Sequence, residues 1–232
     1  MSTRRSHNAM IITIDGPAGA GKSSAAQGLA KRLGFEFLDT GAMYRAVTLA
    51  ALRTGIDLRD NAALGRLLES VHLEMPPGRV LLDGKDVSDQ IRTREVEQAT
   101  GLIADSPVVR RRLGEMQRAI AVGRRMVCEG RDQGTIVFPD AFCKFFLSAA
   151  VEERARRRQA QMAARGETVE LATLLPAIET RDRRDAARES APMRPAADAV
   201  IVDSTGLSLD EVVDRMETEV RRRSERGTRK DE

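Results

Sequence analysis

Aromatic residues are scarce in this sequence, which has no Trp, one Tyr and six Phe among its 232 residues. A core for this chain must therefore be built mainly from Leu, Val, Ile, Ala and Met. Proteins that bind single-stranded nucleic acids stack the bases on aromatic side chains, so this composition argues against such a function. The hydrophobic content of 41% is nevertheless sufficient for the core of one α/β domain.

Cysteine and long apolar runs are also scarce. Cys128 and Cys143 lack the spacing of a zinc site and fall in apolar stretches, so we expect reduced core thiols and a cytoplasmic protein. No apolar run approaches the roughly 20 residues that a membrane-spanning helix needs. Arg4 and Arg5 precede no apolar segment of the kind found in a secretory signal. We therefore expect no membrane partner and no export.

Neither sign of charge is in large excess, because 38 Lys and Arg residues oppose 35 Asp and Glu residues. Alternating basic and acidic residues are typical of solvated helix faces, and we expect no nucleic-acid partner. Only arginines that lie beside other chemical motifs are informative about function.

The most specific motif that is present is a phosphate-binding loop, which directly follows an apolar stretch at residues 10–14. Its glycines let the backbone curl around an anion, while Lys22 supplies a cation for the β- and γ-phosphates. The hydroxyl of Ser23 is placed to bind Mg²⁺, and the N-terminus of a helix predicted at 22–33 favours the same anion. A glycine-rich structural turn is the alternative. The residues predicted to bind ATP are Gly16, Pro17, Ala18, Gly19, Ala20, Gly21, Lys22, Ser23 and Ser24.

Apolar strand patterns alternate with helical patterns along most of the chain, which predicts a parallel sheet with helices on both faces. The turn at Pro76-Pro77-Gly78 predicts an antiparallel hairpin inserted in this fold. We expect an α/β, P-loop three-layer sandwich with a mainly parallel five-stranded core sheet. The expected strands cover residues 10–14, 35–38, 125–128, 143–147 and 199–202.

Polar segments follow two other strands, at the edge of the sheet where parallel α/β folds bind ligands. Thr40 and Arg45 follow residues 35–38, where they predict an anion site or, with equal weight, an ordinary helix cap. Residues 129–135 place Glu129, Arg131 and Asp132 around two glycines. This favours a ligand site, with a structural ion pair between Arg131 and Asp132 as the alternative.

With these motifs the chain resembles the bacterial cytidylate kinases from residue 11 to about residue 221. The resemblance implies transfer of a phosphoryl group from ATP to CMP or dCMP, which gives CDP or dCDP in pyrimidine nucleotide metabolism. It also implies a monomer whose partners are ATP, CMP and dCMP. The matching segments are 16–24, 39–45, 91–93 with 95–96, 130–132 with 134–135, 137–141, 181–188, and 195–199 with 203–205.

The family also implies roles for individual residues on the acceptor side. The positions of Arg45, Arg131 and Arg188 hold the acceptor phosphate, and those of Arg181 and Asp185 hold its sugar. Arg110 and Asp132 fall where the family reads the cytosine edge, which offers a donor to an acid and acceptors to a guanidinium. The predicted substrate-binding set is Thr40, Arg45, Gly101, Arg110, Glu129, Arg131, Asp132, Arg181, Asp185 and Arg188. The predicted catalytic set is Lys22, Arg131, Arg158 and Arg188.

Two positions depart from the family pattern. Gly101 stands where the family often has a serine whose hydroxyl touches the base, so that contact is lost or passes to Thr100 or a water. Glu129 stands where some members have aspartate, a change of one methylene that we expect to be tolerated.

The resemblance further implies a single domain over residues 10–225. A monophosphate-binding subdomain is inserted at about 42–120, and a helical lid lies at about 152–170. Residues 1–9 and 222–232 are expected to form disordered tails. The lid helix carries Arg154, Arg156, Arg157 and Arg158, and a solvated basic face is its alternative explanation.

Two other functions are compatible with a phosphate loop alone. A small-metabolite kinase of the shikimate or gluconate type uses the same core but needs no acid and base for a cytosine edge. A nucleotide-switch or nucleic-acid-binding protein is the second alternative. The chain lacks the Asn-Lys-x-Asp guanine signature that such a switch protein would need.

Overall fold

The structure is a computed structural model that describes residues 9–164 and 166–228. It divides into two compact units, Met1–Phe37 with Gly123–Glu232 and Leu38–Val122, and each is described by itself below. The insert predicted at about 42–120 lies within the second unit, and its role in binding a monophosphate stays a prediction. Residues 1–8 and 229–232, from the two predicted tails, lie outside the described residues.

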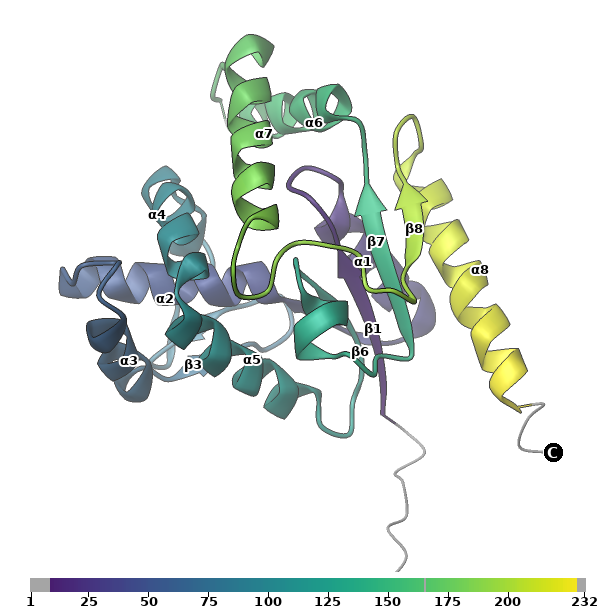
Figure 1. Ribbon diagram of the computed structural model, residues 1–232, viewed down its shortest axis with the longest axis horizontal. Helices are drawn as coiled ribbons and strands as arrows, with labels where there is room; N and C mark the ends of the chain where they lie inside the picture. Colours follow the sequence, from purple (N-terminus) through teal and green to yellow (C-terminus); the bar gives the residue numbers. More distant parts are fainter. Residues whose placement is uncertain (1–8, 165, 229–232) are drawn as a thin grey trace, which may run out of the picture. The chain divides into compact units, whose positions relative to one another are not determined.

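A five-stranded sheet in the order β2-β6-β1-β7-β8 organises the first unit (Figure 1). The central strand β1 pairs in parallel with β6 and with β7, and β7 pairs in parallel with β8. The prediction of an α/β fold around a mainly parallel five-stranded sheet is therefore confirmed. The strands are β1 (Met10–Asp15), β2 (Glu36–Asp39), β6 (Arg125–Glu129), β7 (Cys143–Ser148) and β8 (Val200–Asp203).

Helices α1 (Lys22–Leu33) and α8 (Leu209–Thr228) pack against each other and complete the core of this unit. Small residues of α1 such as Ala25 and Ala26 are buried with Val213 and Met216 of α8 and with the strands. Apart from two phenylalanines, this core consists of aliphatic side chains, Met216 and Cys143, in keeping with the scarcity of aromatic residues.

Two further helices of the first unit follow the carboxyl end of β7. Helix α6 (Val151–Ala163) begins three residues after the strand, and α7 (Leu171–Ala186) packs against it. Ala155, Leu174 and Ile178 form a small apolar cluster between them. Figure 1 shows the two helices in green, crossing each other.

The second unit contains four α-helices and a small antiparallel sheet in the order β3-β4-β5. The sequence predicted a two-stranded hairpin, and the structure adds a third strand. Asp83 and Gly84 both have positive φ values, of 52° and 73°, and turn the chain between β4 and β5. Asp-Gly is a strong signal for such a turn. The elements are α2 (Thr40–Thr54), α3 (Asn61–Ser70), β3 (Leu73–Glu74), β4 (Leu81–Leu82), β5 (Lys85–Asp86), a 3₁₀ turn (Gln90–Arg92), α4 (Arg94–Asp105) and α5 (Pro107–Ala121).

The expectation of disorder from residue 222 onward is wrong for residues 222–228, because α8 continues to Thr228. Ion pairs one helical turn apart support this segment. Glu217 pairs with Arg221, and Glu219 pairs with both Arg222 and Arg223. Pairs at this spacing stabilise a helix that would otherwise be too polar to persist.

Cys128 and Cys143 are free and buried, as predicted. Burial raises the pKa of the Cys143 thiol to about 12 and raises that of Cys128 as well. Both thiols are therefore protonated at neutral pH. Among the described residues, no helix has the length and hydrophobicity needed to cross a membrane.

The contact between α1 and α8 is tight at Gly28, where an added Cβ would lie 2.9 Å from Cγ2 of Val213. We expect Gly28→Ala to lower the free energy of unfolding by ~1–3 kcal/mol, because it overpacks this contact. In a Val213→Ala background the same change should instead stabilise by about 1 kcal/mol, since Ala favours a helix interior over Gly. Urea unfolding of the four proteins of this cycle measures both effects. A destabilisation that persists in the Val213→Ala background would contradict the packing argument.

Candidate functional site

The predicted phosphate loop connects β1 to α1 and adopts backbone conformations that glycine favours. Gly16 has a φ of 142°, and a Cβ at this position would lie 2.0 Å from the carbonyl oxygen of Leu147. Gly21 is the N-cap residue of α1 with a φ of 91°, and no side chain caps this helix. The first amides of α1 are therefore open to an anion, and the helix dipole attracts one.

Lys22 lies at the start of α1 and is 6% exposed. Its ammonium donates a hydrogen bond of 2.7 Å to the carbonyl oxygen of Pro17, within the same loop. Burial, together with repulsion from Arg131, lowers the pKa of Lys22 to about 7, although Glu129 acts in the opposite direction. The loop thus holds a buried amine whose charged form an added anion would stabilise.

Ser23 donates a hydrogen bond of 2.7 Å from its hydroxyl to Oε1 of Glu129. Glu129 ends β6, the strand next to β1, and is 6% exposed. The sequence placed Glu129 with the acceptor-binding residues, whereas the structure places its carboxylate against the phosphate loop. No pattern in the sequence paired these two residues, which lie more than a hundred positions apart and meet only because β1 and β6 are neighbours.

Arginines converge on Asp185 near the end of α7, in the same unit. Nε of Arg131 lies 3.1 Å from Oδ2 of Asp185, and Nη2 of Arg188 lies 2.6 Å from Oδ1. Arg131 thus pairs with Asp185, a residue that lies 54 positions away and was not weighed as its partner from the sequence. Burial alone would raise the pKa of Asp185, but Arg131, Arg188 and Arg181 outweigh it and hold this pKa below its usual value.

Arg181 belongs to the same cluster. Desolvation of its guanidinium and repulsion from Arg131 lower the pKa of Arg181 to about 10, although the residue as a whole is exposed to solvent. Three guanidinium groups thus act on one buried carboxylate. Such a concentration of positive side chains is of the kind that attracts anions.

Two arginines of the predicted lid contact the phosphate loop through its carbonyl oxygens. Arg154 donates a hydrogen bond of 3.1 Å to the carbonyl oxygen of Ala18 and forms an ion pair with Asp182 of α7. Arg157 donates a hydrogen bond of 3.3 Å to the carbonyl oxygen of Ala20. These contacts answer the alternative of a purely solvated basic face, because both side chains are held against the protein.

The other two lid arginines are placed differently. The side chain of Arg156 is 66% exposed and lies 3.6 Å from Glu153 one turn away. Arg158 is partly buried and lies close enough to Arg181 to contribute to the lowering of its pKa. Among the four, Arg158 is thus the one associated with the positive cluster.

In the second unit, Arg45 and Arg110 project from α2 and α5. Arg45 lies 3.0 Å from Oδ2 of Asp39, whose other oxygen accepts the amide of Ala42 at 2.8 Å and caps α2. The guanidinium of Arg110 lies 5.8 Å from the ring centroid of Tyr44 and donates 3.0 Å to the carbonyl of Ala104. Asp39 therefore caps α2, as the helix-cap alternative for this segment predicted. The role of Arg45 in binding a phosphate stays a prediction.

Thr40 and Gly101, the other predicted residues of this unit, are buried in α2 and α4. Thr100, the residue that could replace the hydroxyl missing at Gly101, donates 2.6 Å to the carbonyl of Val96. It also accepts a hydrogen bond of 3.3 Å from the hydroxyl of Thr48.

Asp15 was not singled out from the sequence. It ends β1, is 4% exposed and accepts hydrogen bonds from the backbone amides of Gln133 and Gly134. A buried acid immediately before a phosphate loop was the available signal. The sequence could not reveal which distant amides it would meet.

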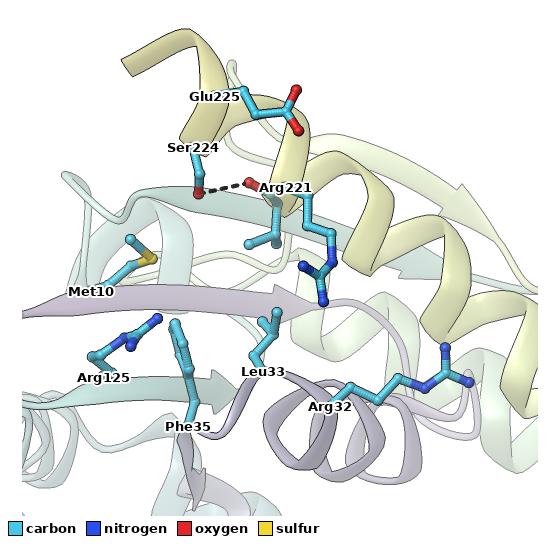
Figure 2. A pocket seen from close by; sticks show the side chains of 9 residues that line it. Met10, Arg32, Leu33, Phe35, Arg125, Arg221, Ser224 and Glu225 are labelled. Carbon is cyan, nitrogen blue, oxygen red and sulfur yellow. Dashed lines mark hydrogen bonds between the residues drawn. The ribbon is translucent and has the colours of Figure 1, made fainter. Parts of the chain in front are cut away.

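A pocket of about 310 Å³ opens at the other end of the strands and is distinct from the candidate site. Met10 and Arg125, which line it, begin β1 and β6, whereas the phosphate loop follows the end of β1. Figure 2 shows Arg125 stacked on Phe35, with the guanidinium 4.4 Å from the ring centroid. The dashed line in the figure marks the hydrogen bond that the Ser224 hydroxyl donates to the backbone carbonyl oxygen of Val220.

The described residues contain no group of three or more His, Cys, Asp or Glu side chains arranged to hold a metal ion. A phosphate loop at the end of the central strand of a parallel sheet, with arginines gathered around Asp185 in the same unit, defines the class of P-loop phosphoryl-transfer proteins.

Within this class the chain belongs to the cytidylate kinase family, whose model matches residues 12–222. A cytidylate kinase of Rhodopirellula baltica is 51% identical, over 88% of this chain and 89% of the relative. One of Citrifermentans bemidjiense is 47% identical, over 95% of this chain and 96% of the relative.

The chain also resembles a solved structure, at an identity low enough that the likeness concerns the fold alone. An uncharacterised protein of Eubacterium ventriosum ATCC 27560 superposes with a TM-score of 0.51 at 12% identity, over 91% of this chain and 98% of the other.

The carboxylate of Asp185 should make stability depend on pH. Because its folded-state pKa is depressed, its stabilisation is present above the ordinary value of 3.8 and is lost as the pH falls through the folded pKa. We expect Asp185→Asn to lower the free energy of unfolding by roughly 3 kcal/mol at pH 7. The difference from the wild type should shrink as the pH falls below 3.8, because protonation of the wild-type carboxylate then removes its charge.

Urea unfolding at several pH values measures this difference. Glu153→Gln, which breaks more exposed pairs on α6, serves as the control and should cost less than about 1 kcal/mol. A penalty for Asp185→Asn that is constant from pH 7 to pH 3 would show that charge is not the cause.

Proposed function

We propose that the protein transfers the γ-phosphoryl group of ATP to CMP and dCMP, forming ADP with CDP or dCDP for pyrimidine nucleotide metabolism. The observation that carries the proposal is the presence in one unit of two groups of cationic side chains, which we interpret as two anion sites. One is the phosphate loop around Lys22, and the other is the arginine cluster around Asp185. Membership of the cytidylate kinase family identifies the acceptor, because its relatives at about half identity bear that name.

We assign the donor to the phosphate loop, residues 16–24. The triphosphate would accept hydrogen bonds from the amides at the start of α1, where no side chain caps the helix. Lys22 would exchange its hydrogen bond to Pro17 for one to a phosphate oxygen. An adjacent anion would raise the pKa of Lys22 and hold it in the charged form that transfer requires.

The same loop fits a magnesium ion that accompanies ATP. The hydroxyl of Ser23 and the carboxylate of Glu129 are hard oxygen donors within 2.7 Å of each other, which suits Mg²⁺ better than a softer metal. Ser23 would hold the ion, with Glu129 beside it, once ATP is bound. The ion would neutralise part of the charge on the β- and γ-phosphates.

We assign the acceptor phosphate to Arg131 and Arg188, with Arg45 as a third contact, following the family pattern. Arg181 and Asp185 would hold the sugar, which requires Asp185 to share its oxygens between arginines and a hydroxyl. Arg110 and Asp132 would read the cytosine edge. Thr40 and Gly101 complete the proposed acceptor site.

Transfer needs no general base in this scheme, because the attacking oxygen belongs to a phosphate that is already ionised at neutral pH. The protein must instead align two anions and neutralise the charge that develops between them. Lys22, Arg131, Arg158 and Arg188 are the proposed cations. Closure of α6, the helix that carries Arg158, would exclude water, which otherwise would hydrolyse ATP.

A coupled assay of ADP release with CMP, dCMP, UMP, AMP and shikimate tests the function. We expect CMP and dCMP to have the highest kcat/KM, because cytosine presents an N4 donor and an N3 acceptor to Asp132 and Arg110, whereas uracil presents an O4 acceptor and an N3–H donor. Lys22→Ala should abolish the signal and controls for contaminating kinases. Preference for shikimate would support a small-metabolite kinase, and ATP hydrolysis without any acceptor would contradict both assignments.

The same assay tests how the base is read. Gly101→Ser restores a hydroxyl at a position where the family often has one. We expect it to leave the preference for CMP over UMP unchanged or to widen it by roughly 1–3 kcal/mol. A narrower preference in this variant would show that the base lies elsewhere.

The lid arginines provide a matched pair of variants on one helix. Arg158→Ala should lower kcat by about 100-fold, which is typical when a preorganised positive group is removed from a charged transition state. Arg156→Ala should change kcat by less than about twofold, because its side chain is 66% exposed. Steady-state kinetics at saturating ATP and CMP measure both. Equal effects of the two substitutions would place Arg158 outside the site.

A further inference from the structure

The turn that follows Arg131 and Asp132 is capped at its N-terminus by a side chain from a distant part of the sequence. Residues Gln133–Val137 form a single π-helical turn after Asp132, which occupies the N-cap position. The amides of Ile136 and Val137 donate to the carbonyl of Asp132, at 2.9 and 3.3 Å. The first amides of such a turn have no partner inside it. The side chain of Asp132 does not cap them.

The side chain of Asp15, at the end of strand β1, accepts the hydrogen bonds of these first amides. The amide of Gln133 donates to its Oδ1 at 2.8 Å, and the amide of Gly134 donates to its Oδ2 at 2.7 Å. Each carboxylate oxygen thus binds one of the two consecutive amides. Asp15 is the last residue of β1 and immediately precedes the phosphate loop. One side chain therefore joins the donor loop to the segment that carries Arg131 and Asp132.

The close approach that makes these bonds possible depends on Gly134. A Cβ at this position would lie 2.9 Å from Oγ1 of Thr13 and 3.2 Å from Cδ of Lys144. The turn is therefore pressed against β1 and β7. Lys144, which is buried, is itself held by Asp198 at 2.9 Å.

A carboxylate in this place is costly, and a simple packing role does not require one. Burial raises the pKa of Asp15 to about 7, and Asp132 adds to this effect, while the two amides and Lys22 oppose it. An uncharged side chain would avoid the desolvation penalty. Of the neutral alternatives, Asn has the same shape but only one acceptor oxygen, and its amide group would face a second donor.

We propose that Asp15 is a positioning residue for the acceptor: by capping residues 133–134 it fixes the backbone at Arg131 and Asp132 relative to the phosphate loop. The proposal rests on the function proposed above, in which these two residues bind CMP. Asp15 itself touches neither substrate. Loss of the cap should let Arg131 and Asp132 move, and displacement of binding groups by about 1 Å can change rates by two orders of magnitude.

Asp15→Asn tests the proposal because it keeps the shape of the side chain and removes one acceptor. We expect KM for CMP to rise by about 10- to 100-fold and discrimination against UMP to decrease. The affinity for ADP, measured by calorimetry, should change by less than about threefold, because the loop amides and Lys22 remain. A merely structural residue would affect both substrates through stability and would not separate them in this way.

Thr13→Ser is the matched control, since Thr13 lies two residues earlier on β1 and is equally buried. It retains the hydroxyl that contacts the turn, and we expect wild-type KM values. If Asp15→Asn does not fold, Gly134→Ala carries the test. This change displaces the turn from Asp15 without altering the carboxylate, and it should raise KM for CMP in the same selective manner.

Amide hydrogen exchange gives a readout that does not depend on the identity of the acceptor. Peptides that cover residues 130–138 should exchange faster in Asp15→Asn than in the wild type or Thr13→Ser. If the wild type does not phosphorylate CMP, the proposed function fails, and the exchange result alone decides whether Asp15 holds this turn.

Three results would overturn the proposal for Asp15. The first is a KM for CMP in Asp15→Asn within about twofold of the wild type. The second is unchanged amide exchange over residues 130–138. The third is an equal loss of ADP affinity, which would assign Asp15 to the phosphate loop instead.

Discussion

The candidate site depends above all on the accommodation of three buried charged residues at the carboxyl ends of β1 and β6. Asp15, Lys22 and Glu129 are only 4–6% exposed. A buried charge is strongly destabilising unless it is hydrogen-bonded or paired. Each of the three has a specific partner: backbone amides for Asp15, the carbonyl of Pro17 for Lys22 and the hydroxyl of Ser23 for Glu129. The position of the loop, the adjoining turn and the end of β6 all follow from these bonds.

This arrangement prepares the loop for an anion. The amides at the start of α1 lack a side-chain cap, and the charged form of Lys22 is disfavoured by burial. A bound phosphate would correct both conditions at once, because it accepts hydrogen bonds and supplies negative charge. The protein groups of the loop alone are therefore not at an electrostatic optimum, which is a common property of functional sites.

In the first unit, the arginines beside the phosphate loop and those around Asp185 form two groups that composition alone could not separate. Arg154 and Arg157 donate to carbonyl oxygens of the phosphate loop and so connect α6 to it. Arg131 and Arg188 instead pair with the buried carboxylate of Asp185. The first group thus bonds to the backbone of the loop, and the second gathers guanidinium groups around one acid.

Several features that depend on neighbouring residues could be predicted from local signals in the sequence. The apolar stretch before the phosphate loop and the glycines of the loop each act within a few residues, and each was found where expected. The third strand β5 was missed although Asp83-Gly84 is a local turn signal. The extension of α8 was missed because ion pairs of Glu219 with Arg222 and Arg223 support a segment whose composition suggests disorder.

The sequence by itself determined the α/β sheet, the phosphate loop and the family, because these depend on residue types at fixed short spacings. Only the tertiary structure decided which distant groups meet. Glu129 contacts Ser23, Arg131 pairs with Asp185, and Asp15 caps a turn that lies more than a hundred residues away. The physical reason is that strand order sets these contacts. Strand β6 lies beside β1 in the sheet, and no short-range pattern in the chain encodes that neighbour.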